Sequence, residues 1–405
     1  MSKNNYLSGK ITPLKWLLRI GSGDSIDMKN VSQNKELEKE VPVVGGNGIM
    51  GYTELSNTGA NTLVVGRVGA HCGNIHFIKE NSWVTDNALK IRLTTDLLDK
   101  TFLKYSLTAL ELNQFANRNA QPLITGETVK SKTILLTSLS EQTQIAKFLD
   151  HKTGQIDRLI EQKENLLKLL AEKRTAIITQ AVTKGLHPNV ETKDSGIDWL
   201  GEIPKHWGVK RFKFCLKEPL KYGANEAAES SDPEQPRFVR ITDVDENGNL
   251  REETFRSIDS EIAKPFLLEE GDLLMARSGA TVGKNFMYKS NWGIACFAGY
   301  LIRARINQEI MLPEFGNLFL NSGSYWDWVN SIFIQSTIQN ISAEKYANLV
   351  LPVPPKEEQK EIVEFAARKR QQLGSVITEI AKSLDKLKEY REALITAAVT
   401  GQIKV

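Results

Sequence analysis

Two stretches of the chain carry apolar residues at every seventh position. The first keeps this period at Leu149, Ile156, Lys163, Leu170 and Ile177, and the second at Ala366, Leu373, Ile380, Leu387 and Leu394. A seven-residue apolar period held over several turns is typical of α-helices that pack in a coiled coil. We therefore predict two long helices, each on the order of 60 Å at about 1.5 Å per residue.

The apolar members of these stripes form the predicted helix seam: Leu149, Ile156, Leu170, Ile177, Leu373, Ile380, Leu387 and Leu394. Further apolar residues are expected to widen it, namely Ile145, Leu159 and Leu166 in the first helix and Ile362, Val376 and Tyr390 in the second. A charge or polar group on the seam, such as Lys163→Glu or Leu170→Asp, is expected to disturb assembly more than ligand choice.

The two helical stretches are copies of one another. Residues 141–183 align with 358–400 without a gap, at a constant offset of 217, and 17 of these 43 positions are identical. A repeat in one chain sees a high effective concentration of its partner. We therefore expect the two helices to pack antiparallel on each other, while a coiled coil with other chains stays an alternative.

The segments between the helices also echo each other. The pattern Arg-x-Gly-Ala-x-x-Gly occurs at Arg67–Gly73 and again at Arg277–Gly283, an offset of 210. Trp83 and Lys90–Arg92 in the first segment are then expected to match Trp292 and Leu301–Arg303 in the second. The chain thus alternates globular unit, long helix, globular unit, long helix, as expected of a duplicated architecture.

Each globular segment reads as mixed α and β. Short apolar runs flank Asn47-Gly48, a strong hairpin signal, and short strands are expected near residues 63–65 and 273–275. Helical pieces are expected near residues 98–112 and 313–328. We predict an α+β fold with a pseudo-two-fold internal repeat, divided into residues 1–137, 138–186, 187–350 and 351–405.

Bulk composition narrows the class without naming a ligand. Of 405 residues, 41% are hydrophobic and 25% charged, typical of globular domains. No stretch reaches the roughly 20 apolar residues of a membrane span, and the polar start does not resemble a signal peptide, so we expect no membrane contact and a cytoplasmic protein. Residues 1–137 hold 16 Lys and Arg against 12 Asp and Glu, whereas residues 195–352 hold 17 against 21. The second segment is therefore acidic, unlike many DNA-binding domains.

Metal and cofactor chemistry find little support. The three cysteines are scattered and form no Cys-x-x-Cys pair, which suits a reducing compartment. His71, Cys72 and His76 are close in sequence but lack a second pair of ligands, so no metal site and no cofactor are predicted.

No enzyme signature fits this sequence. Gly279–Asn285 resembles a phosphate-binding loop, but it has one residue too few between its glycines and Asn where Ser or Thr should bind magnesium. Glu161 and Lys163 supply half of a nuclease motif, yet they lie in the heptad helix, where such residues ordinarily form a solvated face. The chain reads as a binding protein without catalysis of its own.

Several segments resemble the specificity subunits of Type I restriction-modification systems. Those segments are LPVPPKEEQKEIV at 351–363, its counterpart at 138–145, DSGIDWLGEIPKHW at 194–207 and GDLLMARSG at 271–279. The resemblance extends over essentially the whole chain, although the first globular segment lacks a full counterpart of residues 199–207, which leaves its start undefined.

This resemblance implies a DNA-binding subunit that reads a bipartite site. Each globular segment would be a target-recognition domain for one half-site, and the helices would set the spacing and dock two modification (methyltransferase) subunits. Restriction (endonuclease/translocase) subunits would join that core, and the methyl donor and ATP would belong to these partners. A non-DNA-binding coiled-coil scaffold for protein interactions is the alternative, and a free-standing DNA-modifying enzyme would need an active site that was not found.

The resemblance implies that loops of the recognition domains read bases. We expect the base-reading residues in or beside the duplicated turns and just ahead of each helix. The candidates are Arg67, His71, Arg118, Asn119 and Gln121 in the first segment and Arg277, Ser278, Thr281, Lys284, Gln335, Ser336, Thr337, Gln339 and Asn340 in the second. Arg and Lys suit guanine or phosphate, and Asn and Gln suit adenine. Alternatively, Arg67 and Arg277 fix the turns themselves, as the glycines around them are expected to do. Trp326 and Trp328 are expected in the core.

Overall fold

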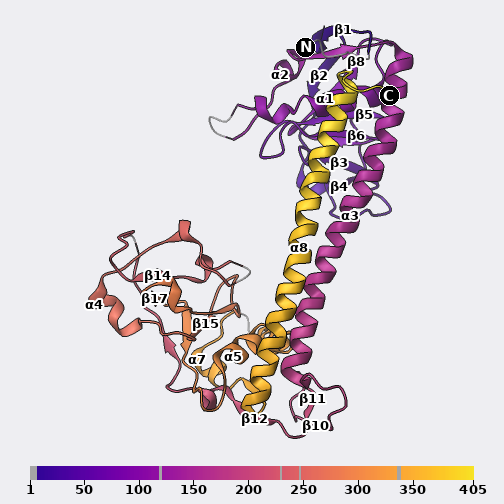
Figure 1. Ribbon diagram of the computed structural model, residues 1–405. Helices are drawn as coiled ribbons and strands as arrows, with labels where there is room; N and C mark the ends of the chain where they lie inside the picture. The colour runs from indigo at the N-terminus through magenta and orange to yellow at the C-terminus, as the bar shows by residue number, and fades with distance from the viewer. Residues whose placement is uncertain (1–6, 118–120, 229, 246–247, 335–338) are drawn as a thin grey trace, which may run out of the picture. The chain divides into compact units, whose positions relative to one another are not determined.

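Two compact units make up the chain in the computed structural model (Figure 1). The structure describes all residues except 1–6, 118–120, 229, 246–247 and 335–338. Unit 1 comprises Met1–Asn165 and Ala381–Val405, and unit 2 comprises Leu166–Ile380. Each unit therefore contains one globular segment and a part of both long helices.

The two predicted long helices are present. Helix α3 spans Leu139–Lys184 and helix α8 spans Lys356–Val399, and both run through the glycines at 154 and 374. Ser138 caps α3 reciprocally with Glu141: the Ser138 backbone N–H donates to the Glu141 carboxylate at 3.1 Å, and the Glu141 N–H donates to Ser138 Oγ at 3.3 Å. Their ends agree with the sequence repeat, because both copies of the Glu-Gln pair lie in a first helical turn.

Unit 1 is built on a four-stranded antiparallel sheet in the order β2-β8-β5-β6. Its strands are β2 (Leu18–Ser22), β5 (Thr62–Gly66), β6 (Ile75–Ile78) and β8 (Ala88–Leu93). The remaining strands are β1 (Lys10–Pro13), β3 (Val41–Gly45), β4 (Gly48–Thr53), β7 (Trp83–Val84) and β9 (Thr133–Leu136). The helices besides α3 and α8 are α1 (Lys100–Ala109), α2 (Gly126–Lys130) and the 3-10 turns η1 (Leu14–Trp16), η2 (Met28–Asn30) and η3 (Leu112–Phe115).

Unit 2 repeats this plan with a sheet in the order β13-β18-β15-β16. Those strands are β13 (Lys221–Tyr222), β15 (Leu273–Ala276), β16 (Asn285–Met287) and β18 (Leu301–Ala304). The others are β10 (Thr192–Asp194), β11 (Glu202–Pro204), β12 (Gly208–Arg211), β14 (Arg237–Val239), β17 (Ala295–Phe297) and β19 (Val350–Val353). Its helices are α4 (Ser260–Ala263), α5 (Pro313–Leu320), α6 (Gly323–Ile334), α7 (Ala343–Ala347) and the 3-10 turns η4 (Phe212–Cys215), η5 (Ile241–Asp243), η6 (Glu252–Thr254), η7 (Lys264–Phe266) and η8 (Ser290–Trp292).

The predicted α+β class and internal repeat are confirmed at the level of strand pairing. In unit 1, β3 pairs parallel with β7 and β1 antiparallel with β9. In unit 2, β14 pairs parallel with β17 and β12 antiparallel with β19. Strands β10 and β11, which follow α3, have no counterpart at the start of unit 1 within the residues that the structure describes.

Strand register corrects one part of the predicted echo. Gly66 at the end of β5 pairs with Ala88, and its equivalent Ala276 pairs with Leu301. Position 88 therefore matches 301, and Arg92 matches Arg305, not Arg303. The sequence alignment missed the extra residues in unit 2 because both strands alternate basic and apolar residues, so a shift of two leaves the pattern unchanged. Trp83 and Trp292 are likewise not equivalent, since Trp83 begins β7 and Trp292 ends η8 before β17.

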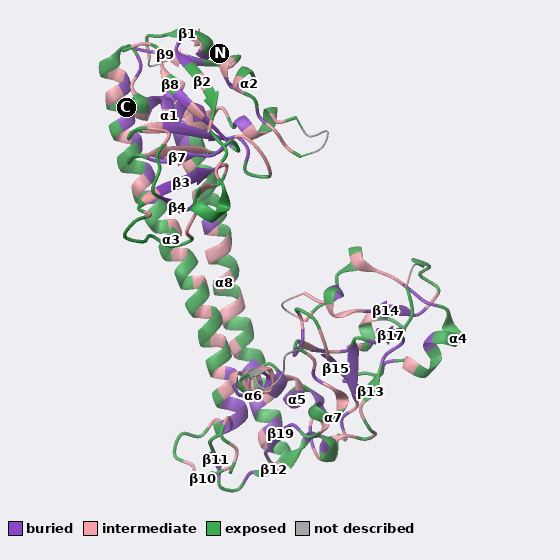
Figure 2. Cartoon of the chain, turned by 180° about the vertical axis from the view of Figure 1, so that it is seen from behind, coloured by how far each residue is buried: buried purple, intermediate pink, exposed green. Residues whose placement is uncertain are grey.

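The predicted helix seam residues are buried or half-buried within their units. Leu149, Ile156 and Leu394 are buried, and the other five are half-buried. Buried residues gather in the sheets and on the parts of the helices beside them (Figure 2). In unit 1, α3 and α8 contribute to one core, and in unit 2 to another.

The predicted width of the seam is partly wrong. Ile145 and Ile362 are buried, but Leu159, Leu166, Val376 and Tyr390 are 40–56% exposed. The second inward stripe instead includes Ala146, Ile160 and Leu167 in α3, together with Thr153 and Arg174. Polar members break the apolar pattern of this stripe, so periodicity alone did not find it.

A buried glutamine ties each long helix to its globular segment. Gln142 accepts a hydrogen bond from the Asp99 N–H at 2.9 Å and donates to the carbonyls of Leu97 and Thr137 at 2.9 and 2.8 Å. Gln359, its repeat counterpart, accepts from the Leu312 N–H at 2.7 Å. It donates to the carbonyls of Ile310 and Pro354 at 3.1 and 2.8 Å. Both side chains are fully buried with their amide groups bonded, so these two glutamines fix where each helix starts.

Candidate nucleic-acid interface

The duplicated glycine turn of unit 1 joins β5 to β6. The Gly73 N–H donates to the Gly66 carbonyl at 2.7 Å, and the Asn74 N–H donates to the His71 carbonyl at 3.2 Å. Gly69 and Gly73 have φ of +87° and +89°, values that L-residues rarely adopt. The glycines therefore serve backbone geometry, as expected.

The turn of unit 2 forms the same hydrogen bonds between β15 and β16. The Gly283 N–H donates to the Ala276 carbonyl at 3.0 Å, and the Lys284 N–H donates to the Thr281 carbonyl at 2.9 Å. Gly279 and Gly283 have φ of +80° and +85°. The two turns thus share one backbone frame while their side chains differ.

The segments ahead of the long helices lie against these turns. In unit 1 the Ile124 N–H donates to the Arg67 carbonyl at 2.8 Å, and the Gly69 N–H donates to the Pro122 carbonyl at 2.9 Å. In unit 2 the Ile341 N–H donates to the Arg277 carbonyl at 2.8 Å, and Asn340 forms a β-bridge with Ser278. Two sets of candidate residues that are far apart in sequence are thus brought together in each unit.

The two turn arginines are engaged inside the fold. Arg67 donates from Nη1 to Ser22 Oγ at 3.0 Å and to the Asp86 carbonyl at 3.3 Å. Arg277 places its guanidinium 4.8 Å from the centre of the Tyr222 ring, and its Nε is buried without a hydrogen-bond acceptor among the described residues. These contacts support the alternative in which both arginines fix the turn.

Other candidates are accessible. His71, Gln121, Lys284 and Gln339 are exposed, and Ser278, Thr281 and Asn340 are half-buried. The Oδ1 atom of Asn340 is buried and has no partner among the described residues. Arg118, Asn119, Gln335, Ser336 and Thr337 lie outside the described residues.

Three other sequence features have a structural explanation. The loop that resembles a phosphate-binding motif leads into strand β16, whereas such motifs open a helix. Glu161 and Lys163 lie within helix α3. Tyr325 stacks at 5.7 Å from Trp326 and Trp328, which pack against the core of unit 2 as expected.

Neither a metal cluster nor a membrane span is found in the described part of the chain. No group of three or more His, Cys, Asp and Glu is placed to hold a metal ion. No described helix combines the length and the apolar character needed to cross a bilayer.

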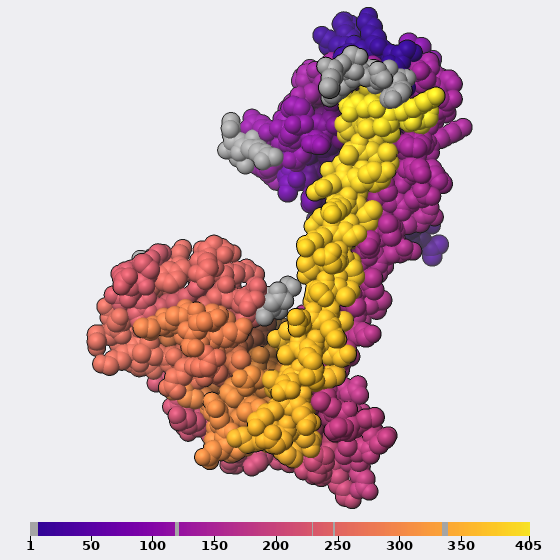
Figure 3. All heavy atoms as spheres, viewed as in Figure 1, coloured from indigo at the N-terminus to yellow at the C-terminus, as the bar shows by residue number. Residues whose placement is uncertain are grey.

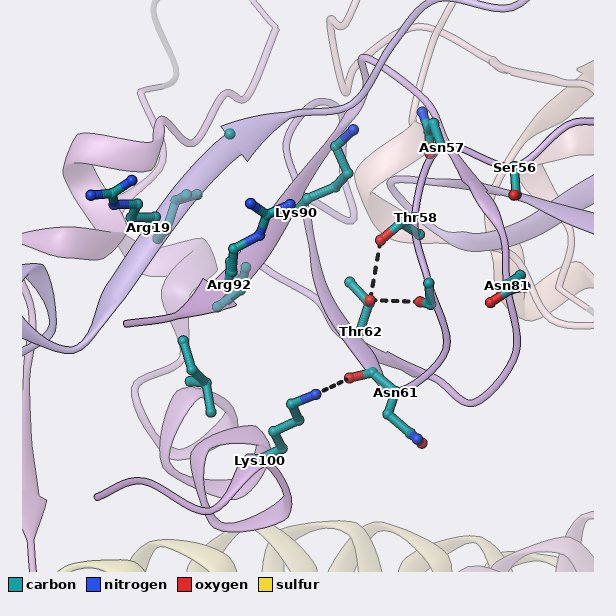
Figure 4. A pocket seen from close by; sticks show the side chains of 15 residues that line it. Arg19, Ser56, Asn57, Thr58, Asn61, Thr62, Asn81, Lys90, Arg92 and Lys100 are labelled. Carbon is teal, nitrogen blue, oxygen red and sulfur yellow. Dashed lines mark hydrogen bonds between the residues drawn. The ribbon is translucent and has the colours of Figure 1, made fainter. Parts of the chain in front are cut away.

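Sequence reasoning missed a cationic cavity in unit 1. The cavity has a volume of about 800 Å³, and its cations are Arg19 on β2, Lys90 and Arg92 on β8, and Lys100 at the start of α1. In Figure 4 Lys100 reaches Asn61 of the loop that also carries Asn57 and Thr58, whereas the Arg19 guanidinium points away from that loop. Basic residues on the same face of two strands were a usable signal, but nothing in the sequence showed that β2 and β8 are neighbours.

One of these cations is neutralised within the protein. Lys90 Nζ lies 3.1 Å from the Asp24 carboxylate, and this hydrogen bond holds the pKa of Asp24 below its usual value. Lys100 donates to the Asn61 carbonyl at 3.1 Å, a contact that leaves its charge unpaired.

Comparison with known proteins agrees with this architecture. The model of the Type I restriction modification DNA specificity domain matches residues 15–169 and 213–369. The chain is 31% identical over 149 residues to the Type I restriction enzyme EcoprrI specificity subunit of Escherichia coli, covering 36% of this chain and 37% of that protein. It is 24% identical over 275 residues to the StySPI specificity subunit of Salmonella potsdam, covering 67% and 57%. The match thus spans less than two thirds of either relative.

The fold is shared with a solved chain described as the structural basis underlying complex assembly and conformational transition of the type I R-M system. That match has a TM-score of 0.72 and 15% identity, and covers 98% of this chain and 99% of the other. The two matched regions each contain one four-stranded sheet, one glycine turn and part of one long helix. The chain therefore belongs to the Type I restriction modification DNA specificity domain family and carries two copies of that domain.

Proposed function

We propose that this protein is the sequence-specific DNA-binding subunit of a Type I restriction-modification complex, with no catalysis of its own. One observation carries the proposal: two turns with the same hydrogen bonds present different side chains. Unit 1 offers His71 and Gln121, and unit 2 offers Thr281 and Lys284. A shared frame with different contact residues suits two half-sites of different sequence.

The chemistry of these side chains suits base edges. Gln pairs with adenine through two hydrogen bonds, Lys donates to guanine, and Thr contacts either edge or the thymine methyl group. Arg67 and Arg277 hold the turns in place, so we assign base reading to the accessible residues around them. The glycines let the backbone approach a duplex closely.

The long helices are the proposed docking sites for two modification subunits, with the restriction subunits joining that core. Leu159 of unit 1 and Val376 of unit 2 occupy equivalent repeat positions and are 40% and 46% exposed. Figure 3 shows a face of α8 that no other described segment covers. Two equivalent exposed apolar positions fit two copies of one partner.

The proposed division of labour follows the predicted segments. Residues 1–137 and 187–350 would each read one half-site, and residues 138–186 and 351–405 would set the spacing. We propose that the complex works in the cytoplasm, where its duplex substrate is found.

Domain exchange tests this function. Residues 10–135 are replaced by the corresponding segment of a family member with a known target, and methylated sites are mapped in a host that carries the intact system. We expect one half of the recognised sequence to change and the other to stay. A change in both halves or in neither contradicts the modular proposal. A complex without any sequence preference supports the alternative, a protein-interaction scaffold, which the acidic charge of the second segment favours.

Point variants refine the same test. His71→Ala with Gln121→Ala should relax one half-site, and Thr281→Ala with Lys284→Ala the other. Each lost base contact should cost about 1–3 kcal/mol in binding, roughly 5- to 150-fold. Lys79→Ala, an exposed change away from the turn, is the control and should leave both half-sites intact.

A further inference from the structure

Two arginines of unit 1 face each other across a pair of strands. In the antiparallel pairing of β2 with β8, Arg19 lies directly opposite Arg92. Like charges at such positions repel each other and destabilise the sheet. Both side chains are exposed, and neither forms an ion pair or a side-chain hydrogen bond with any described residue. The fold therefore keeps an unneutralised pair of positive charges at one point.

The cavity around this pair has no acidic lining. Besides its four cations it is lined by polar side chains of residues 56–62 and by Asn81, and no Asp or Glu contributes. Figure 4 shows Arg19 and Arg92 on adjacent strands, beside the open space of the cavity. A cavity with these walls favours a ligand that carries negative charge.

The equivalent cavity of unit 2 shows the opposite arrangement. Lys217 and Arg305 are the counterparts of Arg19 and Arg92. They lie side by side on neighbouring strands, since the Lys217 N–H donates to the Arg305 carbonyl at 2.8 Å. The loop beside them carries Glu269, Glu270 and Asp272, which line that cavity of about 420 Å³.

Three acidic residues form ion pairs with the arginine of unit 2. The Arg305 guanidinium lies 2.8 Å from Asp272, 2.7 Å from Glu269 and 3.2 Å from Glu218. At an offset of 210, the positions of Glu269, Glu270 and Asp272 hold Gly59, Ala60 and Thr62 in unit 1. The same strand position thus carries an internally paired arginine in one unit and an unpaired one in the other.

We infer that the cavity of unit 1 binds backbone phosphate of the DNA duplex, through Arg19 and Arg92. This inference rests on the proposed function and adds a contact that positions the duplex without reading its sequence. Arginine is suited to phosphate because its guanidinium donates two parallel hydrogen bonds. Phosphate contacts of this kind fix the register of a protein on DNA.

The cavity lies within reach of a duplex bound at the turn. Arg92 is four residues along β8 from Ala88, which pairs with Gly66 next to the turn. Four residues of an antiparallel strand span roughly 13 Å. This distance is similar to the width of the DNA major groove, about 12 Å. The turn can therefore contact a base in the groove while the cavity contacts a phosphate of the DNA strand that borders it.

Salt-dependent binding tests the inference on the full chain assembled with its modification subunits. The wild-type complex must first prefer its mapped target, which separates this test from failure of the proposed function. Arg19→Gln with Arg92→Gln should then lower affinity at least tenfold at low salt, equally for target and non-target duplexes. The slope of log K against log salt should become shallower by about 2, since each phosphate contact contributes roughly 0.9.

A charge transplant tests the same site without removing either arginine. Thr62→Asp imports the counterpart of Asp272, and should weaken binding to all duplexes by neutralising Arg92. Thr62→Asn has the same shape without the charge and is the matched control, which should bind like the wild type. Arg19→Lys with Arg92→Lys should keep the wild-type slope.

Two outcomes would overturn the inference. The first is that both the Arg-to-Gln pair and Thr62→Asp keep the affinity and the salt slope of the wild type. The second is a loss of affinity for the target duplex alone, which would assign the arginines to base reading. If the Arg-to-Gln pair fails to fold, neutral methylphosphonates placed one at a time beside the first half-site serve instead. At one or two positions they should weaken the wild-type complex, and uniform tolerance would overturn the inference.

Discussion

The two units of this protein share a backbone plan and differ in where their charges are neutralised. In both, two cations face each other on adjacent strands beside a loop. Unit 2 supplies three carboxylates from that region for Arg305, whereas unit 1 supplies none for Arg92. A duplicated fold therefore preserves the positions of side chains while leaving their electrostatic role free to change.

The helix pair shows a second difference of the same kind. In unit 1, Arg391 lies 2.7 Å from Asp157, and Lys388 lies 3.2 Å from Glu164. In unit 2 the counterpart of Arg391 is Arg174. The counterpart of Asp157 is Gly374, which has no carboxylate. Arg174 shares a cavity of about 310 Å³ with Arg370, and neither forms an ion pair with a described residue.

The largest loss of stability is expected at the feature that both units share, the buried glutamine at the start of each long helix. Gln142→Met and Gln359→Met each leave three backbone groups without their partner, one of them buried and two part-buried, at up to about 1–3 kcal/mol per group. We expect each variant to lose about 3–5 kcal/mol of stability, with the loss of hydrogen-exchange protection confined to unit 1 for the first and to unit 2 for the second. Gln144→Met, on the exposed face of α3, is the control and should stay within about 0.5 kcal/mol. A neutral result for one glutamine would show that the two attachments are not equivalent.

An intermediate effect is expected where the units differ. Asp272 is buried and accepts two hydrogen bonds from Arg305, at 2.9 and 2.8 Å, and one from the Glu269 N–H at 2.8 Å. Asp272→Asn should therefore destabilise unit 2 by about 3 kcal/mol, as for other partly buried pairs that lose one charge. Thermal unfolding measures this loss. Thr62→Asn at the equivalent position should change stability by less than about 0.5 kcal/mol, and equal losses in both units would contradict the contrast drawn between them.

The smallest effect should come from the helix pair. Gly374→Asp restores the repeat partner of Arg174, and no heavy atom outside its own helix turn lies within 4 Å of the added Cβ. We expect it to exceed Gly374→Asn in stability by about 0.5 kcal/mol, the usual value of an exposed ion pair. The difference between these two variants should vanish in 1 M salt, where exposed charges are screened. A difference that persists in salt would point to packing instead.

Sequence patterns were sufficient for the features that depend on neighbours along the chain. The presence of α3 and α8 follows from the seven-residue period and from the repeat. The glycine turns follow from residues that tolerate positive φ, and the hairpin around Asn47 from its turn chemistry. These features are local, so a short window of residues carries the physical information that decides them.

Features that depend on which strands meet were not available to the same reasoning. The sequence aligned Arg92 with Arg303, because a shift of two residues leaves an alternating strand unchanged, and only the pairing of β8 with β5 shows that its counterpart is Arg305. Exposure of Leu159 and Tyr390 likewise depends on how far each helix turns toward its unit.

The amino-acid sequence by itself thus determined the duplication, the two long helices, the paired turns and the resemblance to DNA specificity subunits. The tertiary structure alone decided that Arg19 and Arg92 face each other without a carboxylate. The reason is physical: strand pairing places residues from distant parts of the chain within a few ångströms, and whether a charge is neutralised depends on what stands at that distance.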